Sequence, residues 1–295
     1  MSEFRKIALQ KIAAKLGIPS NVDMNGPAVN RKNAKSSGRL TEFVKKYLGE
    51  PSSSFKEAFL KLPPGPKREQ LVYDEVTKRN LKANLVPITI DGPNGTKITY
   101  KVMPDYITID GLRVPMSGRT AQKVADHFGM VLPTDKMSDQ IYDAADVKLR
   151  PPPLSASGYT DSSGRHYSAK EVVEHKIGDP EAAAVYSDKI NQALKDKGKG
   201  GLVAGHMKDV IMPYNPDKLG LYGWRGEDGK LIQPPRTPHD TSVHTEYGAG
   251  TRLADKEVEI QTPDGKTIKT TMDKLMNDPE LYKAVSNFKG VRRYT

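Results

Sequence analysis

From Val86 onward, β-branched and polar residues alternate in three short runs, which are residues 87–90, 97–102 and 106–109. A period of two is typical of strands that bury one face. Asn94 and Gly95 separate the first two runs, and this dipeptide favours a tight hairpin turn. The sequence therefore predicts a region of mixed, mostly antiparallel β structure.

Further hairpins are expected near the C-terminal end of the chain. The runs 221–224 and 231–233 flank a polar turn at residues 227–230. The runs 258–261 and 267–270 flank a turn that contains Asp264 and Gly265. Two short helices near Met272 and Pro279 are expected to follow.

Helical spacing of apolar residues dominates the first 80 residues. We expect helices over residues 4–16 and 39–48, a third that begins at Ser54 with Glu57 as its capping partner, and a fourth that carries Leu71, Val72 and Val76. Other helices are expected from the caps Ser117 and Thr134, and over residues 180–194. These patterns predict an α+β protein: a helical N-terminal module, residues 1–82, and an α+β domain, residues 83–295, with flanking helices. An irregular Pro- and Ser-rich loop is expected at 149–168.

The charge of the chain favours a polyanionic partner. Lys and Arg total 46 against 36 for Asp and Glu, which gives a net charge of +10, and the excess lies in the first 80 residues. Such a surface attracts anionic cell-wall polymers or nucleic acid; a solvated face that maintains solubility is the alternative. The chain has no cysteine, which excludes a disulfide framework and a thiol nucleophile.

Targeting and cofactor motifs are missing from the sequence. The N-terminus lacks the apolar run of a signal peptide, and no stretch approaches the ~20 apolar residues of a membrane span. We therefore expect synthesis in the cytoplasm, with action at the cell wall only after release or injection. Phosphate loops, dinucleotide fingerprints and zinc-finger spacings are absent too.

Three of the six histidines, His206, His239 and His244, lie in one short window. Three imidazoles can bind Zn²⁺ and leave a position open for a water molecule, which the metal makes acidic enough to attack a peptide bond. Asp209 or Glu246 would then orient a ligand or act as general base. The pattern predicts a metal-assisted hydrolytic site, with His206, Asp209, His244 and Glu246 as its catalytic residues.

Other interpretations of the histidines remain open at the sequence level. Without a metal, His206 or His244 can act as general acid or base, with Asp209 or Glu246 fixing the tautomer. Ser242, two residues from His244, is a conceivable nucleophile. The simplest interpretation is that loop histidines order a turn-rich segment through hydrogen bonds.

Two aromatic and two cationic residues are candidates for contacts with a substrate. Tyr222 and Trp224 can line a groove and stack on a sugar or peptide, although a single tryptophan of this kind also suits a core. Arg225 and Arg252 can bind carboxylates in a bidentate manner.

Several strings resemble an uncharacterised family of bacterial and phage-associated proteins. They are Val114-Pro-Met-Ser, Leu132-Pro-Thr-Asp-Lys-Met, Gly205-His-Met-Lys-Asp, Tyr222-Gly-Trp, Ile232-Gln-Pro and the segment His239-Asp to Arg252-Leu. The N-terminal segment Ser36 to Leu48 is faintly similar to segments that precede catalytic domains in cell-wall lytic proteins. The resemblance implies action on peptidoglycan.

The chain departs from this family at two motifs. The family carries a histidine where this chain has Arg225, and an Asp-Tyr-Ser string where this chain has Glu246, Tyr247 and Gly248. If that histidine is a ligand or a base, the chemistry is altered or lost here.

The favoured sequence-based hypothesis is therefore a peptidoglycan hydrolase of peptidase or amidase type, from a phage or a bacterium, with Zn²⁺ as its candidate cofactor and the cell wall or another polyanion as its partner. Two rivals remain. One is a non-enzymatic structural or cargo protein of a phage or contractile injection particle, and the other is a basic nucleic-acid-binding protein, whose affinity should fall steeply with salt.

Overall fold

The computed structural model describes residues 54–197, 201–226, 228–232, 239–240 and 245–294. The chain divides after Ser52, and all described residues belong to the second unit. The expected helices at 4–16 and 39–48, and most of the basic run, lie outside the described residues. So do the side chains of His239 and Asp240, and the whole of Ser242 and His244.

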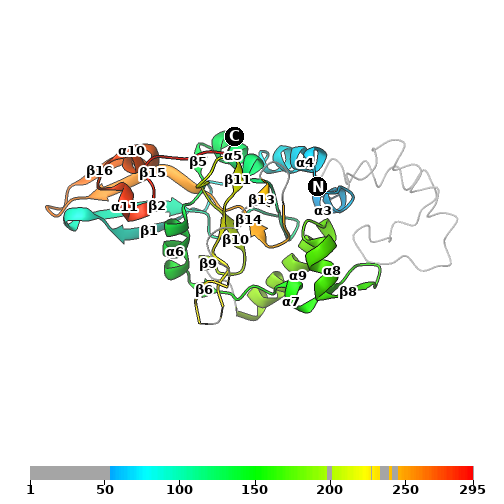
Figure 1. Ribbon diagram of the computed structural model, residues 1–295. Helices are drawn as coiled ribbons and strands as arrows, with labels where there is room; N and C mark the ends of the chain where they lie inside the picture. The colour runs from blue at the N-terminus through cyan, green and yellow to red at the C-terminus, as the bar shows by residue number, and fades with distance from the viewer. Residues whose placement is uncertain (1–53, 198–200, 227, 233–238, 241–244, 295) are drawn as a thin grey trace, which may run out of the picture. The chain divides into compact units, whose positions relative to one another are not determined.

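The described unit combines helices with mostly antiparallel strands, so the predicted α+β class is confirmed (Figure 1). Its helices are α3 (Phe55–Leu60), α4 (Pro66–Val76), α5 (Gly118–His127), α6 (Asp135–Ala144), α7 (Leu154–Ser157), α8 (Ala169–Glu171), α9 (Pro180–Lys197), α10 (Met272–Asn277) and α11 (Tyr282–Val285), with a 3₁₀ turn η2 (Pro93–Gly95) and a π-helical turn η3 (Val172–Lys176).

The longest strands form one sheet in the order β1 (Val86–Asp91), β2 (Lys97–Val102), β15 (Ala254–Gln261) and β16 (Thr267–Thr271), and β5 (Met130–Val131) pairs with β15. The shorter strands are β3 (Thr108–Ile109), β4 (Leu112–Arg113), β6 (Val147–Lys148), β7 (Tyr159–Thr160), β8 (His166–Tyr167), β9 (Val203–Ala204), β10 (Lys208–Val210), β11 (Lys218–Leu219), β12 (Leu221–Tyr222), β13 (His239–Asp240) and β14 (Ala249–Gly250).

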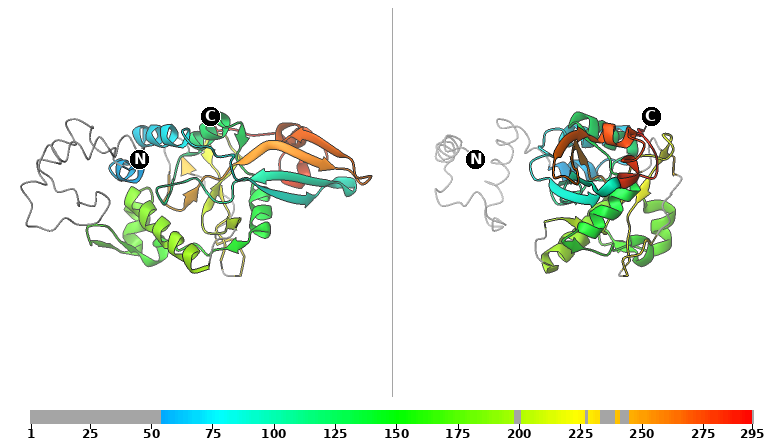
Figure 2. Two further views of the ribbon diagram at one scale, coloured as in Figure 1. Left: turned by 180° about the vertical axis from the view of Figure 1, so that it is seen from behind. Right: turned by 90° about the vertical axis from the view of Figure 1, so that its left-hand side faces the viewer.

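Two predicted hairpins build the main sheet. β1 and β2 pair from Val86↔Val102 to Asp91↔Lys97, and Asn94 and Gly95 adopt φ of 54° and 74° in the turn between them. β15 pairs with both β2 and β16. The two hairpins extend together from the rest of the described unit, as Figure 2 shows from two further sides.

One face of this sheet is apolar and covered. Ile98, Tyr100 and Val258 are buried on it, and α6 and α10 pack against β1 and β15. Thr89, Glu259 and Lys101 alternate with the buried residues and lie on the solvated side, as expected for an antiparallel sheet with one dry face.

The predicted helix caps are also confirmed. The Ser54, Ser117 and Thr134 hydroxyls accept hydrogen bonds from backbone N–H groups three residues later, at 3.2, 3.3 and 3.0 Å. These bonds satisfy donors that the first turn of a helix leaves open.

The segment 149–168 differs from the expected irregular loop. It contains the short helix α7 and the hairpin β7–β8, and Leu149, Leu154 and Tyr159 are buried. The rings of Tyr159 and Tyr167 stack with centroids 5.2 Å apart. Proline and serine content suggested a solvated connection, but the aromatic and leucine side chains between them pack into the core.

The helices α3 and α4 pack against the rest of the described unit. Phe59, Val72 and Val76 are completely buried, α3 contacts α9, and α4 contacts α5. The buried Arg68 donates to the carbonyl of Gly178 at 3.0 Å and to the Thr245 hydroxyl. The boundary after residue 82 thus stays a prediction, while residues 55–76 lie within the packing of residues 83–294.

Candidate functional site

A small three-stranded sheet brings three of the predicted site residues together. β10 pairs parallel with β14 and antiparallel with β12, with Asp209 opposite both Gly250 and Tyr222. His206 and Asp209 lie at or just before β10, and Arg252 follows β14. The convergence of His206, Asp209 and Arg252 therefore follows from strand pairing across about 40 residues of sequence.

His206 lies completely inside the protein, with 0% of its surface exposed. Its Nε2 atom is 3.2 Å from Oδ1 of Asp105, and the edge of its ring meets Tyr106, with centroids 5.1 Å apart. The Tyr186 hydroxyl donates to the backbone carbonyl of His206 at 2.5 Å. Burial lowers the pKa of the His206 imidazole, although Asp105 opposes this shift. At neutral pH the ring is therefore mainly uncharged, and its Nε2–H group donates a hydrogen bond to the Asp105 carboxylate.

Asp105 is the more exposed partner of the imidazole. Its side chain is 26% exposed, and its Oδ2 atom accepts from Arg113 at 2.6 Å. Desolvation alone would raise the pKa of this carboxyl. The hydrogen bond from His206 and the charges of Arg113 and Arg252 outweigh it, so the pKa lies well below its usual range.

Two buried arginines complete the network. Arg113 also donates to the side-chain oxygen of Asn191 at 2.7 Å. Arg252 donates to the carbonyl of Val203 at 2.5 Å, and its guanidinium lies 4.5 Å from the centroid of the Tyr106 ring. Nε and Nη1 of Arg252 are buried without a hydrogen-bond partner among the described residues.

Asp209 is buried beside this network. Ser138 donates a hydrogen bond to Oδ2 of Asp209, and Oδ1 is buried with no hydrogen bond of ordinary geometry from any described residue. Burial raises the pKa of the Asp209 carboxyl, although the charge of Arg252 and the Ser138 hydrogen bond act in the opposite direction. We call Asp105, Tyr106, Arg113, His206, Asp209 and Arg252 the His206 cluster.

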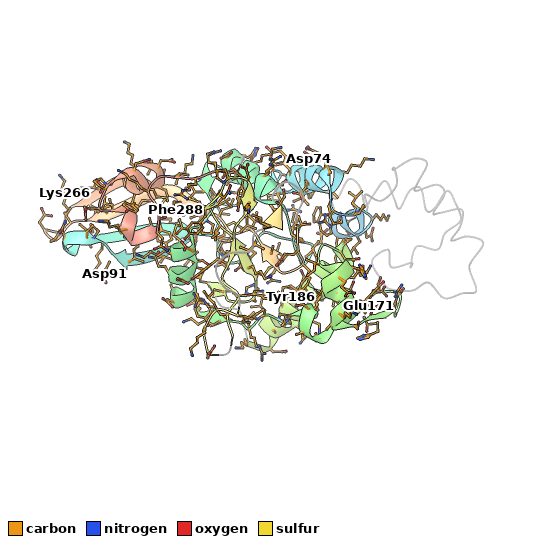
Figure 3. All side chains as sticks on the ribbon, viewed as in Figure 1. Asp74, Asp91, Glu171, Tyr186, Lys266 and Phe288 are labelled. Atoms are coloured by element: carbon orange, nitrogen blue, oxygen red, sulfur yellow. The ribbon has the colours of Figure 1, made fainter. Side chains whose placement is uncertain are left out.

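Glu246 and Trp224 belong to a neighbouring buried group. The Lys208 ammonium lies 2.5 Å from Oε1 of Glu246 and 4.3 Å from the Trp224 ring centroid. The indole N–H of Trp224 donates to the Tyr186 hydroxyl at 3.1 Å. Figure 3 labels Tyr186 on α9, among side chains from the middle of the described unit. Trp224 therefore packs in the core and offers no platform to a ligand.

The side chains of Tyr222 and Arg225 both contact Asp139 on α6, closer to the surface. The Tyr222 hydroxyl is 2.9 and 3.0 Å from the two carboxylate oxygens of Asp139, and Arg225 forms an ion pair with the same carboxylate. The Arg225 guanidinium also lies 4.5 Å from the Tyr142 ring centroid. Desolvation raises the pKa of Asp139 despite both partners. Arg225 therefore has a structural anion partner within the chain.

The predicted zinc site receives no support from the described residues. Within them, no group of three His, Cys, Asp or Glu side chains could hold a metal ion. His206 directs Nε2 to Asp105, and its Nδ1 atom is buried. The described neighbours of His206 thus do not fit a zinc ligand set, and the roles predicted for His239 and His244 lie outside the described side chains.

Sequence reasoning missed Asp105, Arg113 and Ser138. Arg113 lies in an alternating run between Leu112 and Val114, where an arginine is normally expected on the solvent side. Asp105 is 101 residues from its partner His206. Only the three-dimensional pairing shows that these charges face each other inside the protein.

Among the described residues, this arrangement supplies buried ionic cross-links, and its imidazole has no exposed surface. A catalytic histidine needs one ring nitrogen that reaches the substrate and one that is held by a carboxylate. In the His206 cluster, the carboxylate lies on the solvent side and both nitrogens lie inside. The cluster therefore joins distant segments of the chain rather than presenting a base.

Comparisons with protein families, with curated proteins and with solved structures find no match to this chain. The part of the chain that the structure describes contains no helix of the length and apolarity needed to cross a bilayer.

Proposed function

We propose that this protein is a non-enzymatic structural component of a phage or contractile injection particle. One observation carries the proposal: the His206 imidazole is sealed inside the protein behind Asp105. His206, Asp209 and Glu246, the described residues among those that suggested hydrolysis, serve instead to hold the fold together.

The peptidoglycan hydrolase hypothesis requires that the substrate reach the catalytic side chains. A general base must come within about 3 Å of the proton that it removes. His206 and Asp209 are 0% and 4% exposed, so a cross-linked polymer such as peptidoglycan cannot reach either side chain. The replacement of the family histidine by Arg225, which is bound to Asp139, also favours a chain without that chemistry.

Rigidity is the property that the buried charges provide. Asp105 joins Arg113 to His206 across about 100 residues of sequence, and Arg252 joins the segment after β14 to the carbonyl of Val203. Removing one partner of a buried ion pair costs several kcal/mol because the other charge is left inside. A fold that is cross-linked by buried charges suits a component that must keep its shape in an assembly. The sequence resemblance to phage-associated proteins supports the same proposal.

A paired experiment tests the proposal. In the first part, the full chain is incubated with dye-labelled peptidoglycan at acidic and neutral pH, with and without Zn²⁺, and we expect no release of dye. In the second part, particles from the producing strain are purified on a density gradient, and we expect the chain at a fixed ratio to the other particle proteins.

Turnover would overturn the proposal. Dye release by the wild-type chain that is lost in a folded His206→Ala variant would establish the hydrolase. The absence of the chain from purified particles would contradict a structural role there.

A further inference from the structure

A segment without regular secondary structure follows α11. It comprises residues 286–294, which belong to no helix or strand. In Figure 1 the segment is drawn in red and runs back from α10 and α11 towards α5. Phe288 and Tyr294 are its buried aromatic residues. None of its residues belongs to the His206 cluster, so the way in which it is held needs a separate explanation.

Tyr294 lies in a slot that a glycine keeps open. The Tyr294 hydroxyl donates to the carbonyl of Ile211 at 2.8 Å and accepts from the backbone N–H of Gly220, between β11 and β12, at 2.9 Å. The ring passes the first residue of α5, Gly118, where a Cβ atom would lie 2.7 Å from a ring carbon. Any larger residue at position 118 would therefore fill this space. We call the site formed by Gly118, Ile211 and Gly220 the Tyr294 slot.

The Tyr294 hydroxyl takes the place of one hydrogen bond in the small sheet. The pairing Val210↔Leu221 sets Ile211 opposite Gly220, and the Ile211 N–H donates to the Gly220 carbonyl at 3.1 Å. In an antiparallel pair of this kind the return bond runs from the Gly220 N–H to the Ile211 carbonyl. Here the Tyr294 hydroxyl bonds to both of these groups. A hydroxyl donates and accepts at once, whereas a phenylalanine ring does neither, so the slot selects a tyrosine.

The backbone contributes little to the attachment of residues 291–294, which we call the strap. The N–H of Gly290 donates to the carbonyl of Met276 at 2.8 Å. Beyond Gly290, no backbone–backbone hydrogen bond joins the strap to another described residue. Segments with few backbone hydrogen bonds open at a lower cost in free energy than the whole fold. Gly290 is therefore the point from which the strap can separate.

The two arginines of the strap make contacts near the surface. Arg292 donates to the backbone carbonyl of Tyr214 at 2.9 Å, and Arg293 forms an ion pair with Asp126 on α5. The side chains of Arg293 and Asp126 are 50% and 38% exposed. Ion pairs with this exposure contribute little to stability, because water and salt screen them. Tyr294 is therefore the main anchor of the strap.

We propose that the strap is releasable and that the Tyr294 slot is a peptide-binding site, which the chain fills with its own residues Val291 to Tyr294. The slot takes a tyrosine because the hydroxyl must bridge two backbone groups. Asp126 favours a basic residue directly before that tyrosine. The ligand is therefore a peptide that contains the sequence Arg-Tyr, and while the strap is bound, a peptide from outside has to compete with it.

Binding of the chain's own sequence as a free peptide tests the site. The probe is the peptide of residues 288–295, with fluorescein at its amino end and an amide at its carboxyl end. It is added to the full chain that carries Tyr294→Ala, and binding is followed by fluorescence anisotropy. We expect a dissociation constant on the order of 0.1 mM. The wild-type chain should bind the probe at least about tenfold more weakly, because its attached strap competes at an effective concentration of roughly 1 mM or more.

Three matched changes show where the probe binds. A probe with Tyr294→Phe lacks the bridging hydroxyl and should bind about tenfold more weakly. Gly118→Ala, added to the Tyr294→Ala chain, places a Cβ atom in the slot and should abolish binding. Tyr282→Ala, at a half-buried tyrosine of α11, leaves the strap bound, so this chain should behave like the wild type.

Four binding results would overturn the proposal. They are no binding to the Tyr294→Ala chain, equal binding to that chain and the wild type, an equally tight probe with phenylalanine, and unchanged binding after Gly118→Ala. Thermal unfolding of each variant supplies one further criterion. A Tyr294→Ala chain that does not fold would show that residues 291–294 are part of the core rather than a releasable strap.

Discussion

His206 shows how the surroundings of a side chain decide what it does. The same imidazole that suggests catalysis in a Gly-His-x-Lys-Asp string donates to Asp105, contacts the edge of Tyr106 and has no exposed surface. Because Asp105 also binds Arg113, the imidazole is one part of a charge network whose members depend on each other.

Replacing His206 should therefore destabilise the protein. His206→Ala removes a packed ring and one hydrogen bond to a partly buried carboxylate, so we expect a loss of about 2–4 kcal/mol in the free energy of unfolding. Urea unfolding followed through the single tryptophan, Trp224, measures this loss. The control is His175→Ala, at a side chain that is 71% exposed, which should change stability by less than about 0.5 kcal/mol. Equal effects of the two changes would contradict the structural role of His206.

The protonation of His206 should also make stability depend on pH. Burial lowers the pKa of His206 in the folded protein, whereas the unfolded chain keeps a pKa near about 6.5. Below that pH the unfolded chain binds a proton that the folded chain does not, so stability falls as the pH drops.

Unfolding of the wild type and of His206→Gln at a series of pH values isolates this effect. The raised pKa of Asp209 acts in the opposite direction in both proteins, and burial, its largest cause, is common to both. Between about pH 6.5 and 5 the wild type should lose more stability than the variant. Parallel curves would mean that the pKa of His206 is the same in the folded and unfolded chain, which would contradict its burial.

At the scale of elements, short-range signals predicted much of the structure. The caps Ser54, Ser117 and Thr134, and the turn at Asn94 and Gly95, depend on residues within a few positions of each other. The His206 cluster could not be predicted in this way, because its contacts join residues such as Asp105 and His206 across the whole fold. The prediction of an irregular loop at residues 149–168 was wrong for the same reason. The core that buries Tyr159 is formed by segments that are distant in the sequence.

The position before His206 requires a glycine for two reasons, which are its positive φ and the closeness of a neighbouring carbonyl oxygen. Gly205 has φ of +93°, and a Cβ atom there would lie 2.7 Å from the carbonyl oxygen of Leu149. Gly164 has a similar φ of +87° but open space around it. Gly164→Ala should thus cost only the backbone penalty, about 1–2 kcal/mol, while Gly205→Ala should cost clearly more because the clash adds to it.

Chemical denaturation of the two glycine variants measures the difference. A larger loss for Gly205→Ala confirms that close packing positions the chain at His206. If both variants lose the same amount, the segment around Gly205 can relax, and the cluster is less tightly packed than the structure indicates.

At the scale of the whole molecule, α3 and α4 belong to the same packed core as the sheet. Phe59, Val72 and Val76 are buried, and Arg68 bonds to Gly178 and Thr245. We therefore expect a fragment of residues 54–295 to fold cooperatively, and a fragment of residues 83–295 to expose apolar surface and aggregate. Circular dichroism and thermal unfolding distinguish the two, and a stable fragment 83–295 would instead support a domain boundary after residue 82.

Chemical modification of histidines tests the central claim most directly. Diethylpyrocarbonate reacts with accessible imidazoles, and mass spectrometry locates each modified residue. His127, His166 and His175 are exposed, so we predict that they react in the folded protein, whereas His206 reacts only after denaturation. Modification of His206 in the folded protein at a rate similar to that of His166 would show that solvent reaches the ring, and would contradict the sealed, structural cluster on which the proposed function depends.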